Sequence, residues 1–373
     1  MASTGMLTGN ALTVKKWALK GWLNLGMQTC YGYAASKGII HYADEFIGTR
    51  ARGDQLTYDY TNKLTGIPVG EGGTLDGNEE ALNLGSYTIA MNTTRVGVLN
   101  PNDDTIEQQR TNVDFGKQAS KLIPARHGEL LDTAFFYQAA GANPTSFTLN
   151  GTTWSGTNKL FVQGHNTPVA PSTNRIVRAN AAATDQALTS ADRMSLDLID
   201  FALEKNYISD QPIEMVNGGF DLFISPEQAV DLRQDAAGKI QWFDINLAQI
   251  MGGKENTLEN PTRNGMQYLG VYQGVRIWQA GRVAYGLNSG TSAVITTTRR
   301  AVLLGKAALT FASPFASKLT DSDAPLVFKS QLKDYDYYKG IEGRMIYGLK
   351  KTVPTNGEDV GTMVLSTYAA SHA

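Results

Sequence analysis

The sequence predicts an α+β fold in which helices and strands occupy separate stretches of the chain and one long ribbon leaves the body. Two strand-like runs, 55–61 and 84–98, alternate apolar and polar side chains and are joined by a glycine-rich segment far longer than a hairpin turn. Helical spacing follows over 105–135, and most further strands are predicted beyond residue 220. We find no tandem repeat of fixed period.

The predicted ribbon, residues 51–100, has too little to bury within its own subunit. An isolated two-stranded hairpin is marginally stable in water, and ordering about 45 residues costs roughly 1–2 kcal/mol of backbone entropy each. We therefore expect the ribbon to lie on a neighbouring subunit. The expected contact residues are Gly66, Gly70, Gly73, Asp76, Gly77, Asn78, Glu79 and Glu80. For the acidic ones we expect inter-subunit ion pairs, with Arg95 and Arg110 as candidate partners.

The N-terminal segment, residues 1–50, is predicted to be an arm that carries an amphipathic helix over 11–30. Trp17 and Trp22 share its apolar face, and three lysines lie towards the other face. Two tryptophans on one short helix predict packing against a large surface. A helix lying on a membrane surface is the alternative.

A long helix is predicted after the ribbon. Thr105 and Gln108 have the spacing of a capping box, and apolar side chains at helical spacing continue to residue 135. Pro124 and Gly128 are expected to kink or interrupt this helix. If it is continuous, a helix of about 35 residues would span about 50 Å, long enough to support the subunit along much of its length.

The second half of the chain mixes irregular segments with short elements. Residues 142–190 are rich in Asn, Thr, Ser, Gly and Pro, so we expect an irregular loop or a small inserted subdomain in which only 160–162 is strand-like. A helix over 190–206 follows. Then come a strand over 220–224 and a helix with Ser225 as N-cap, Pro226 at its first position and Gln228 as capping partner. Strands are predicted at 267–280 and 294–304, and 342–353 with 359–368 are predicted to form a final strand pair about a turn at Asn356-Gly357.

Composition narrows the class of protein. Among the 373 residues 42% are apolar but only 18% are charged, a balance typical of a protein whose surface is largely covered by partners. The net charge of −2 gives no basic footprint for nucleic-acid recognition. The single cysteine, Cys30, excludes an internal disulfide and fits a reducing compartment. The chain shows neither an apolar run of membrane-spanning length nor a secretory signal pattern at its first residues.

Motifs for catalysis or cofactor binding are weak throughout, and the sequence predicts neither an enzyme nor a cofactor. His41, Asp44 and Glu45 have helical ligand spacing, but they form half a site without a second part. Cys30 is expected to be a small buried residue rather than a nucleophile. The glycine-rich residues 70–77 match no phosphate-binding pattern and no calcium loop.

Several blocks of sequence, in order along the chain, carry a family resemblance. They are Gly53–Tyr58, Leu64–Gly66, Leu75–Leu82, Gln109–Thr111, Phe223–Arg233, Leu269–Ile277 and Leu303–Ala308. These blocks resemble the major capsid proteins of tailed bacteriophages with the HK97-like fold, in the family that includes coat proteins of podophages carrying a virion RNA polymerase. The resemblance is spread over residues 12–310, with weaker similarity to about 368, and residues 142–180 depart from the pattern.

The resemblance implies a structural protein that self-assembles, as hexamers and pentamers of one chain, into an icosahedral shell around double-stranded DNA. Its expected parts are an N-terminal arm (1–50), an extended loop (51–100), a spine helix and peripheral domain (101–215, with the insertion at 142–190), an axial domain (216–325) and C-terminal strands of the peripheral domain (326–373). Expected partners are a portal, decoration or scaffolding proteins and DNA bound without specificity, and no membrane. The chain is expected in the virion, assembled in the host bacterial cytoplasm. An encapsulin-like compartment shell and an enzyme with an unrecognised site are the alternatives.

Overall fold

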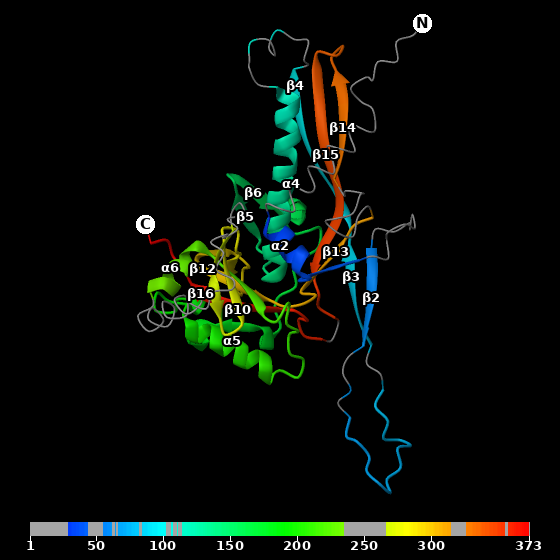
Figure 1. Cartoon of the computed structure of the whole chain (residues 1–373), viewed down its shortest axis with the longest axis vertical. Helices are drawn as coiled ribbons and strands as arrows, with labels where there is room; N and C mark the ends of the chain where they lie inside the picture. Colours follow the sequence, from blue (N-terminus) through cyan, green and yellow to red (C-terminus); the bar gives the residue numbers. More distant parts are fainter. Residues whose placement is uncertain are drawn as a thin grey trace, which may run out of the picture.

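A long helix and a long strand run side by side along one half of the molecule, and a narrow two-stranded ribbon projects from the opposite end (Figure 1). The computed structural model describes residues 29–43, 55–61, 64, 66–81, 84–101, 106, 110, 114–234, 266–314, 326–354 and 357–372. A body built on a sheet and covered by helices lies to one side of them, at the lower left of Figure 1.

The first sheet forms what we call the blade. Its strand order is β1 (Ile40–Tyr42), β13 (Leu309–Ala312), β15 (Tyr338–Lys351) and β14 (Leu326–Lys333), and β4 (Asn92–Pro101) also pairs with β15. Helix α4 (Phe115–Ala139) lies against β15 and β4. Gly343 of β15 allows this close approach, because a Cβ there would lie 2.3 Å from Ile123 Cγ2 on α4.

The second sheet forms the body. Its order is β7 (Ile176–Arg178), β16 (Thr362–Tyr368), β12 (Val294–Leu304), β8 (Phe220–Ile224), β10 (Val275–Ala280) and β9 (Met266–Tyr272), with β11 (Tyr285–Leu287) paired to β12. The remaining helices and turns are α2 (Cys30–Lys37), α5 (Leu196–Ile208), α6 (Pro226–Gln234), η2 (Gly156–Val162), η3 (Thr173–Arg175), η4 (Ala179–Ala181) and η5 (Asp185–Ala187). Two small two-stranded sheets complete the described residues: β2 (Gln55–Thr61) with β3 (Leu84–Ala90), which is the ribbon, and β5 (Ser146–Leu149) with β6 (Thr152–Ser155).

Both faces of the body sheet are buried, and strand β8 shows how its sequence achieves this. Its side chains alternate between faces, as in any strand. Leu222 and Ile224 join the core cluster that contains α5, whereas Phe223 packs edge-on against Phe135 and Phe136 of α4 at 5.8 Å between ring centroids. A strand buried on both faces is mostly apolar, and the single charged residue of β8, Asp221, is paired with Arg276 at 2.8 Å.

Local signals confirm the predicted start of α6. Ser225 Oγ accepts a hydrogen bond from the Gln228 backbone N–H at 3.2 Å, and Gln228 Oε1 accepts one from the Ser225 N–H at 2.9 Å. This is the predicted capping box, and α6 begins at the predicted Pro226. The helix predicted over 190–206 begins later, at Leu196, where Ser195 is the N-cap and its Oγ accepts from the Leu198 N–H at 3.4 Å.

The predicted strand over 84–98 is two strands. β3 ends at Ala90 and pairs with β2, whereas β4 begins at Asn92 and pairs with β15 in the blade. The alternation changes phase at this break: the inward-facing side chains occupy odd positions up to Met91 and even positions from Thr94 onward. This change of phase marks the point where the backbone passes from one sheet to the other.

The predicted interruption of the long helix is wrong. Helix α4 runs without a break through Pro124 and Gly128, from the N-cap Asp114 to Ala139. Both residues are buried, and packing along β15 outweighs the backbone hydrogen bond that proline lacks. The predicted capping residues Thr105 and Gln108, and most of the predicted helix over 11–30, lie outside the described residues.

Three further expectations for the second half of the chain need correction. Residues 160–162 belong to the 3-10 helix η2 and not to a strand. The predicted strand 267–280 is a hairpin, since Gln273 and Gly274 both have positive φ and reverse the chain between β9 and β10. The predicted final strand pair is wrong, because β15 and β16 lie in different sheets and the intervening residues 352–361 carry the chain between them.

Sheet pairing also cuts across the predicted domain boundaries. The body sheet takes β7 from the predicted insertion at 142–190 and β16 from the predicted C-terminal segment 326–373, while β13 of the predicted segment 216–325 lies in the blade. Strands pair regardless of their distance in sequence, so the sheets group the chain differently from its linear segments. The division into arm, loop, peripheral and axial domains stays a prediction.

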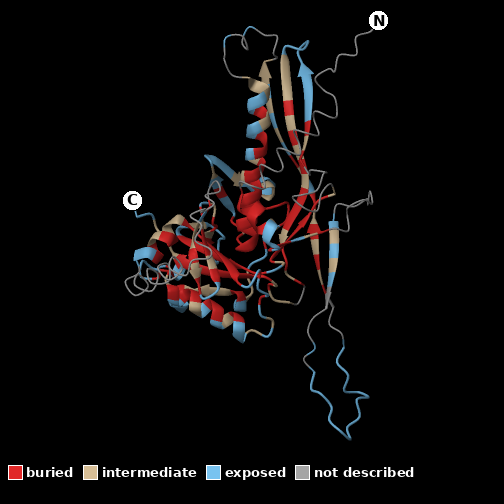
Figure 2. Cartoon of the chain, viewed as in Figure 1, coloured by how far each residue is buried: buried red, intermediate tan, exposed pale blue. Residues whose placement is uncertain are grey.

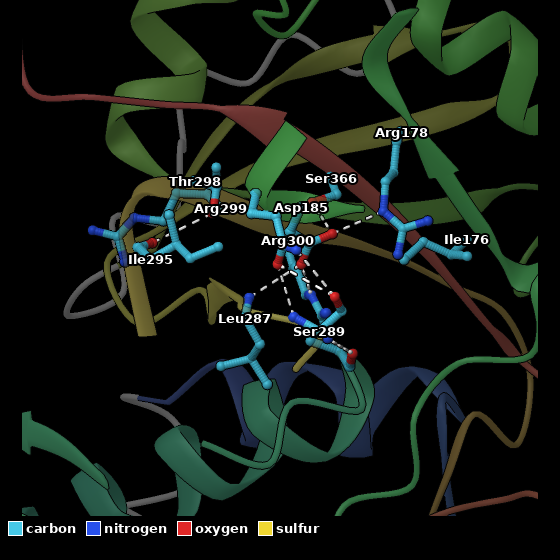
Figure 3. A network of polar contacts seen from close by, with 12 residues as sticks. Ile176, Arg178, Asp185, Leu287, Ser289, Ile295, Thr298, Arg299, Arg300 and Ser366 are labelled. Atoms are coloured by element: carbon cyan, nitrogen blue, oxygen red, sulfur yellow. Dashed lines mark hydrogen bonds and ion pairs between the residues drawn. The ribbon is translucent and has the colours of Figure 1, made fainter. Parts of the chain in front are cut away.

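A buried carboxylate joins four elements of the body (Figure 3). Asp185 accepts hydrogen bonds from Arg178 Nε at 2.9 Å, Arg300 Nε at 2.7 Å, Ser366 Oγ at 3.1 Å and the Leu287 N–H at 3.2 Å. Burial alone would raise the pKa of Asp185, but the positive charges of Arg300 and Arg178 outweigh it and lower that pKa. The network fixes η5 to β7, β12, β16 and β11.

Candidate inter-subunit surfaces

The ribbon is anchored to the blade at its root. Its strands pair from Gln55 with Ala90 to Thr61 with Leu84. Ile89 of β3 is fully buried, the Tyr87 hydroxyl lies 2.9 Å from Thr310 Oγ1, and Lys350 Nζ donates to the Thr88 carbonyl at 2.6 Å. The root is therefore part of the folded subunit.

The tip of the ribbon, which we define as residues 64–81, lies far from the body (Figure 2). Every described residue in it is exposed, including Ile67 at 89% and Leu75 at 61%. Its hydrogen bonds include local ones: Glu80 accepts from the Gly66 N–H, Glu79 Oε2 accepts from the Gly77 N–H at 2.8 Å, and Asn78 Nδ2 donates to the Thr74 carbonyl at 3.0 Å. Such contacts shape the tip without burying its apolar side chains.

The predicted contact residues all lie on this tip and are exposed: Gly66, Gly70, Gly73, Asp76, Gly77, Asn78, Glu79 and Glu80. Arg95 lies on β4, where its guanidinium forms a two-pronged pair with Glu342 of the same chain at 2.6 and 2.8 Å. Arg110 is exposed. Trp17 and Trp22 lie outside the described residues. The inter-subunit roles of these residues stay predictions.

The blade carries a second exposed surface of different chemistry. Exposed lysines lie on α4 and β14, at Lys117, Lys121, Lys329 and Lys333. Large apolar side chains are exposed among the same elements and at the β14–β15 turn: Leu99, Leu122, Leu332, Tyr335 and Tyr337. Residues 64–81 contain four carboxylates and no lysine or arginine, so the tip and the blade surface have complementary charge.

Sequence reasoning missed the polar turn Gln163–Asn166, which lies in the predicted insertion and contacts the ribbon root. Asn166 bonds to the backbone of Ala90, and His165 Nε2 lies 2.8 Å from Thr94 Oγ1. The His165 ring also packs edge-on against Tyr347 at 5.0 Å. Burial lowers the pKa of His165 to about 4. Composition typical of a loop concealed these residues, and no sequence motif marks them.

The weak motifs for catalysis and metal binding lie partly within the described residues. Cys30 is buried, as predicted, and burial raises the pKa of its thiol. His41 lies on β1 with its ring 5.9 Å from that of Tyr58, whereas Asp44 and Glu45 lie outside the described residues. Within the described ranges no cluster of three metal-ligating side chains occurs, and no helix there has the length and apolar character to cross a membrane.

Comparisons with known proteins identify the fold. The capsid of Ralstonia phage GP4 superposes with a TM-score of 0.66 and 21% identity, covering 89% of this chain and 92% of that one. The Cyanophage Pam1 capsid gives a TM-score of 0.62 and 18% identity, covering 89% of each chain. The head of Helicobacter pylori bacteriophage KHP40 gives 0.55 and 14%, covering 84% and 85%. No curated protein matches the chain significantly.

A family model described as phage capsid protein matches residues 8–371. The narrower resemblance to podophages with a virion RNA polymerase stays a prediction. With the fold and the family in agreement, the exposed ribbon and the lack of a catalytic motif are explained by one role. The chain belongs to the phage capsid protein family, has the HK97-like fold, and is a structural major capsid protein of the virion rather than an enzyme.

Proposed function

We propose that this chain assembles as hexamers and pentamers into an icosahedral shell around double-stranded DNA, and that the tip of each subunit lies on its neighbour. The observation that carries the proposal is the exposure of Ile67 and Leu75 on a ribbon whose root is firmly anchored. A tip that buries nothing within its subunit gains apolar burial, about 25 cal/mol per Å², only when another chain covers it.

The blade surface of the neighbour is the receiving surface that fits the tip. Carboxylates of Glu71, Asp76, Glu79 and Glu80 would face the exposed lysines of α4 and β14, and the apolar side chains of both surfaces would meet. Exposed ion pairs contribute only about 0–1 kcal/mol each, so they serve mainly to orient the contact. Repeated apolar contacts supply most of the stability of the shell.

Further partners follow from this role. We propose that the shell assembles in the host bacterial cytoplasm with a portal, and with decoration or scaffolding proteins, and contacts packaged DNA without sequence specificity. The hairpin β5–β6 in the insertion 142–190 is the proposed surface for a decoration protein, because most of its described residues face solvent. The N-terminal arm, with Trp17 and Trp22, is proposed to pack on a neighbouring subunit.

Deleting residues 66–78 tests the proposed role of the tip. The subunit should keep its midpoint of chemical denaturation, because the deleted residues are exposed, while shells seen by electron microscopy should be absent or open. A control replaces 66–78 with a glycine–serine linker of equal length, which keeps the reach of the ribbon but removes its side chains. Closed shells of normal stability from both variants would refute the proposal.

A further inference from the structure

The ribbon and the blade meet at a break between strands. β3 of the ribbon ends at Ala90 and β4 of the blade begins at Asn92. At this break the Ala90 N–H donates to Asn166 Oδ1 at 2.9 Å, and Asn166 Nδ2 donates to the Ala90 carbonyl at 2.9 Å. One side-chain amide thus pairs with both backbone groups of the last ribbon residue, as a neighbouring strand would.

Asn166 is itself held rigidly. Its Nδ2 also lies within 2.9 Å of the Gly164 carbonyl and 3.3 Å of the Leu349 carbonyl on β15. From α4, the fully buried Gln138 donates through Nε2 to the carbonyls of Gln163 at 2.6 Å and Asn166 at 2.7 Å. The turn Gln163–Asn166, which we call the brace, is therefore tied to the helix and to the strand of the blade.

Two glycines make room for this arrangement. Gly164 has φ +70°, and a Cβ there would lie 2.8 Å from the Leu349 carbonyl oxygen. Gly348 lies where β15 passes the end of β3, and a Cβ there would lie 2.2 Å from the Ala90 carbonyl oxygen. No side chain can separate the brace, β15 and the ribbon root at this point. The three backbones are in direct contact.

We propose that the brace fixes the direction in which the ribbon leaves the blade, with Asn166 as the positioning residue and Met91 as the point about which the ribbon would otherwise turn. Tyr87 and Lys350 hold the ribbon further along β3, whereas Asn166 is the side chain that bonds to both backbone groups of its last residue. The proposal rests on the proposed function in one respect: a fixed ribbon direction sets the angle between neighbouring subunits, and hence the curvature of the shell.

The test compares Asn166→Ala and Asn166→Asp with the full-length chain. Asn166→Asp keeps the shape but loses the Nδ2 donor and places a carboxylate against three carbonyl oxygens. Gln228→Ala is the matched control, since Gln228 is an equally buried amide with hydrogen bonds to Ser225, Arg299 and Thr367 in the body sheet. Asn166→Ser, whose side chain is too short to reach both groups of Ala90, replaces Asn166→Ala if that variant does not fold.

Hydrogen exchange of unassembled subunits is the first measurement. Loss of the brace should speed exchange over 84–91 by about 10-fold, the effect of losing about one net hydrogen bond, and Gln228→Ala should leave that segment unchanged. Unchanged exchange over 84–91 in all Asn166 variants would overturn the proposal. This measurement needs no inter-subunit contact, so it tests the brace even if deletion of the tip leaves shells intact.

The diameter distribution of assembled shells is the second measurement. By electron microscopy the Asn166 variants should give a mixture of diameters and open shells, whereas Gln228→Ala should give the single diameter of the parent chain. Shells of unchanged, single diameter from Asn166→Asp, despite faster exchange over 84–91, would contradict the link between ribbon direction and curvature.

Discussion

The body and the tip of the ribbon are built on opposite principles. In the body both faces of the sheet are covered, strand β8 is buried at every position, and even the charged Asp185 is 1% exposed with four hydrogen-bonding partners. On the tip every described residue is exposed, and glycines such as Gly72 and Gly77 adopt positive φ. Figure 2 shows this contrast along the length of the molecule.

The contrast separates two uses of sequence. In the body, side chains are selected for contacts within one chain, so substitution should lower the free energy of unfolding. On the tip the described side-chain contacts are local and leave the side chains exposed, so substitution should change assembly and have little effect on unfolding. The ribbon root lies between these cases, because Asn166 fixes the backbone of its last residue while its outer end leads into the exposed tip.

The largest effect is expected at the centre of the body. Asp185→Ala would leave the guanidinium groups of Arg178 and Arg300 without their carboxylate, and removing one partner of a buried ion pair costs about 3–5 kcal/mol. Chemical denaturation monitored by circular dichroism measures this loss. The exposed Asp197 supplies the control, since Asp197→Ala should change the free energy of unfolding very little. A loss below about 1 kcal/mol for Asp185→Ala would show that the network is not central to the body.

Acid should weaken the region between body and ribbon through His165. Its pKa is lowered to about 4 in the folded chain, against about 6.5 when unfolded, so between these values the unfolded chain binds more protons. Stability from neutral His165 is complete above pH about 6.5 and is lost as pH falls to about 4, by about 3 kcal/mol.

Asp132 acts in the opposite direction and must be separated from His165. Burial raises the pKa of Asp132 to about 6, so lowering the pH from 6 towards 4 favours the folded chain at that residue. The free energy of unfolding should be measured from pH 7 to pH 4 for the parent chain and for His165→Gln. Asp132 is present in both chains, so its contribution cancels when one free energy is subtracted from the other. A difference that does not change with pH would contradict the assignment to His165.

A smaller effect is expected from the cap of α6. Ser225→Ala removes the hydroxyl that accepts from the Gln228 N–H and should destabilise the chain by about 1 kcal/mol. Ser172 provides a matched control, because its buried Oγ has no hydrogen-bond partner within the described residues. The free energy of unfolding of Ser172→Ala, measured by thermal or chemical denaturation, should therefore equal or exceed that of the parent chain. Equal losses for the two variants would argue against the capping role.

The smallest effect on unfolding, with the largest on assembly, is expected at the tip. Ile67→Asp should change the free energy of unfolding by less than about 0.5 kcal/mol, because Ile67 is 89% exposed. Shell yield, measured by sedimentation, should fall as a charge enters the proposed apolar contact. Ile67→Leu keeps the apolar side chain and should assemble normally. Normal shells from Ile67→Asp would place the contact elsewhere on the ribbon.

Elements with strong local signals were predictable from the sequence. The capping box at Ser225 predicted α6, and the helical spacing around Leu196 and Ile199 predicted α5. The strand β8 was also predicted, although it contains the charged Asp221. Local signals failed where long-range pairing decided the outcome. Residues 84–98 were predicted as one strand although β3 and β4 belong to different sheets, and a change of phase in the alternation after Met91 marks the break. Helix α4 passes through Pro124 because burial along β15 outweighs a missing hydrogen bond.

The sequence by itself determined the class of the protein, the position of the ribbon and the exposure of Gly66–Glu80. A glycine-rich, acidic segment without a core of its own has these properties in any arrangement of the remaining chain. Only the tertiary structure decided where the ribbon is held. Asn166 lies 76 residues from Ala90 in sequence, and a side-chain amide bonded to a backbone leaves no periodicity or motif to read. The direction of the ribbon is therefore a property of the folded subunit, whereas the exposure of its tip follows from the composition of residues 66–80.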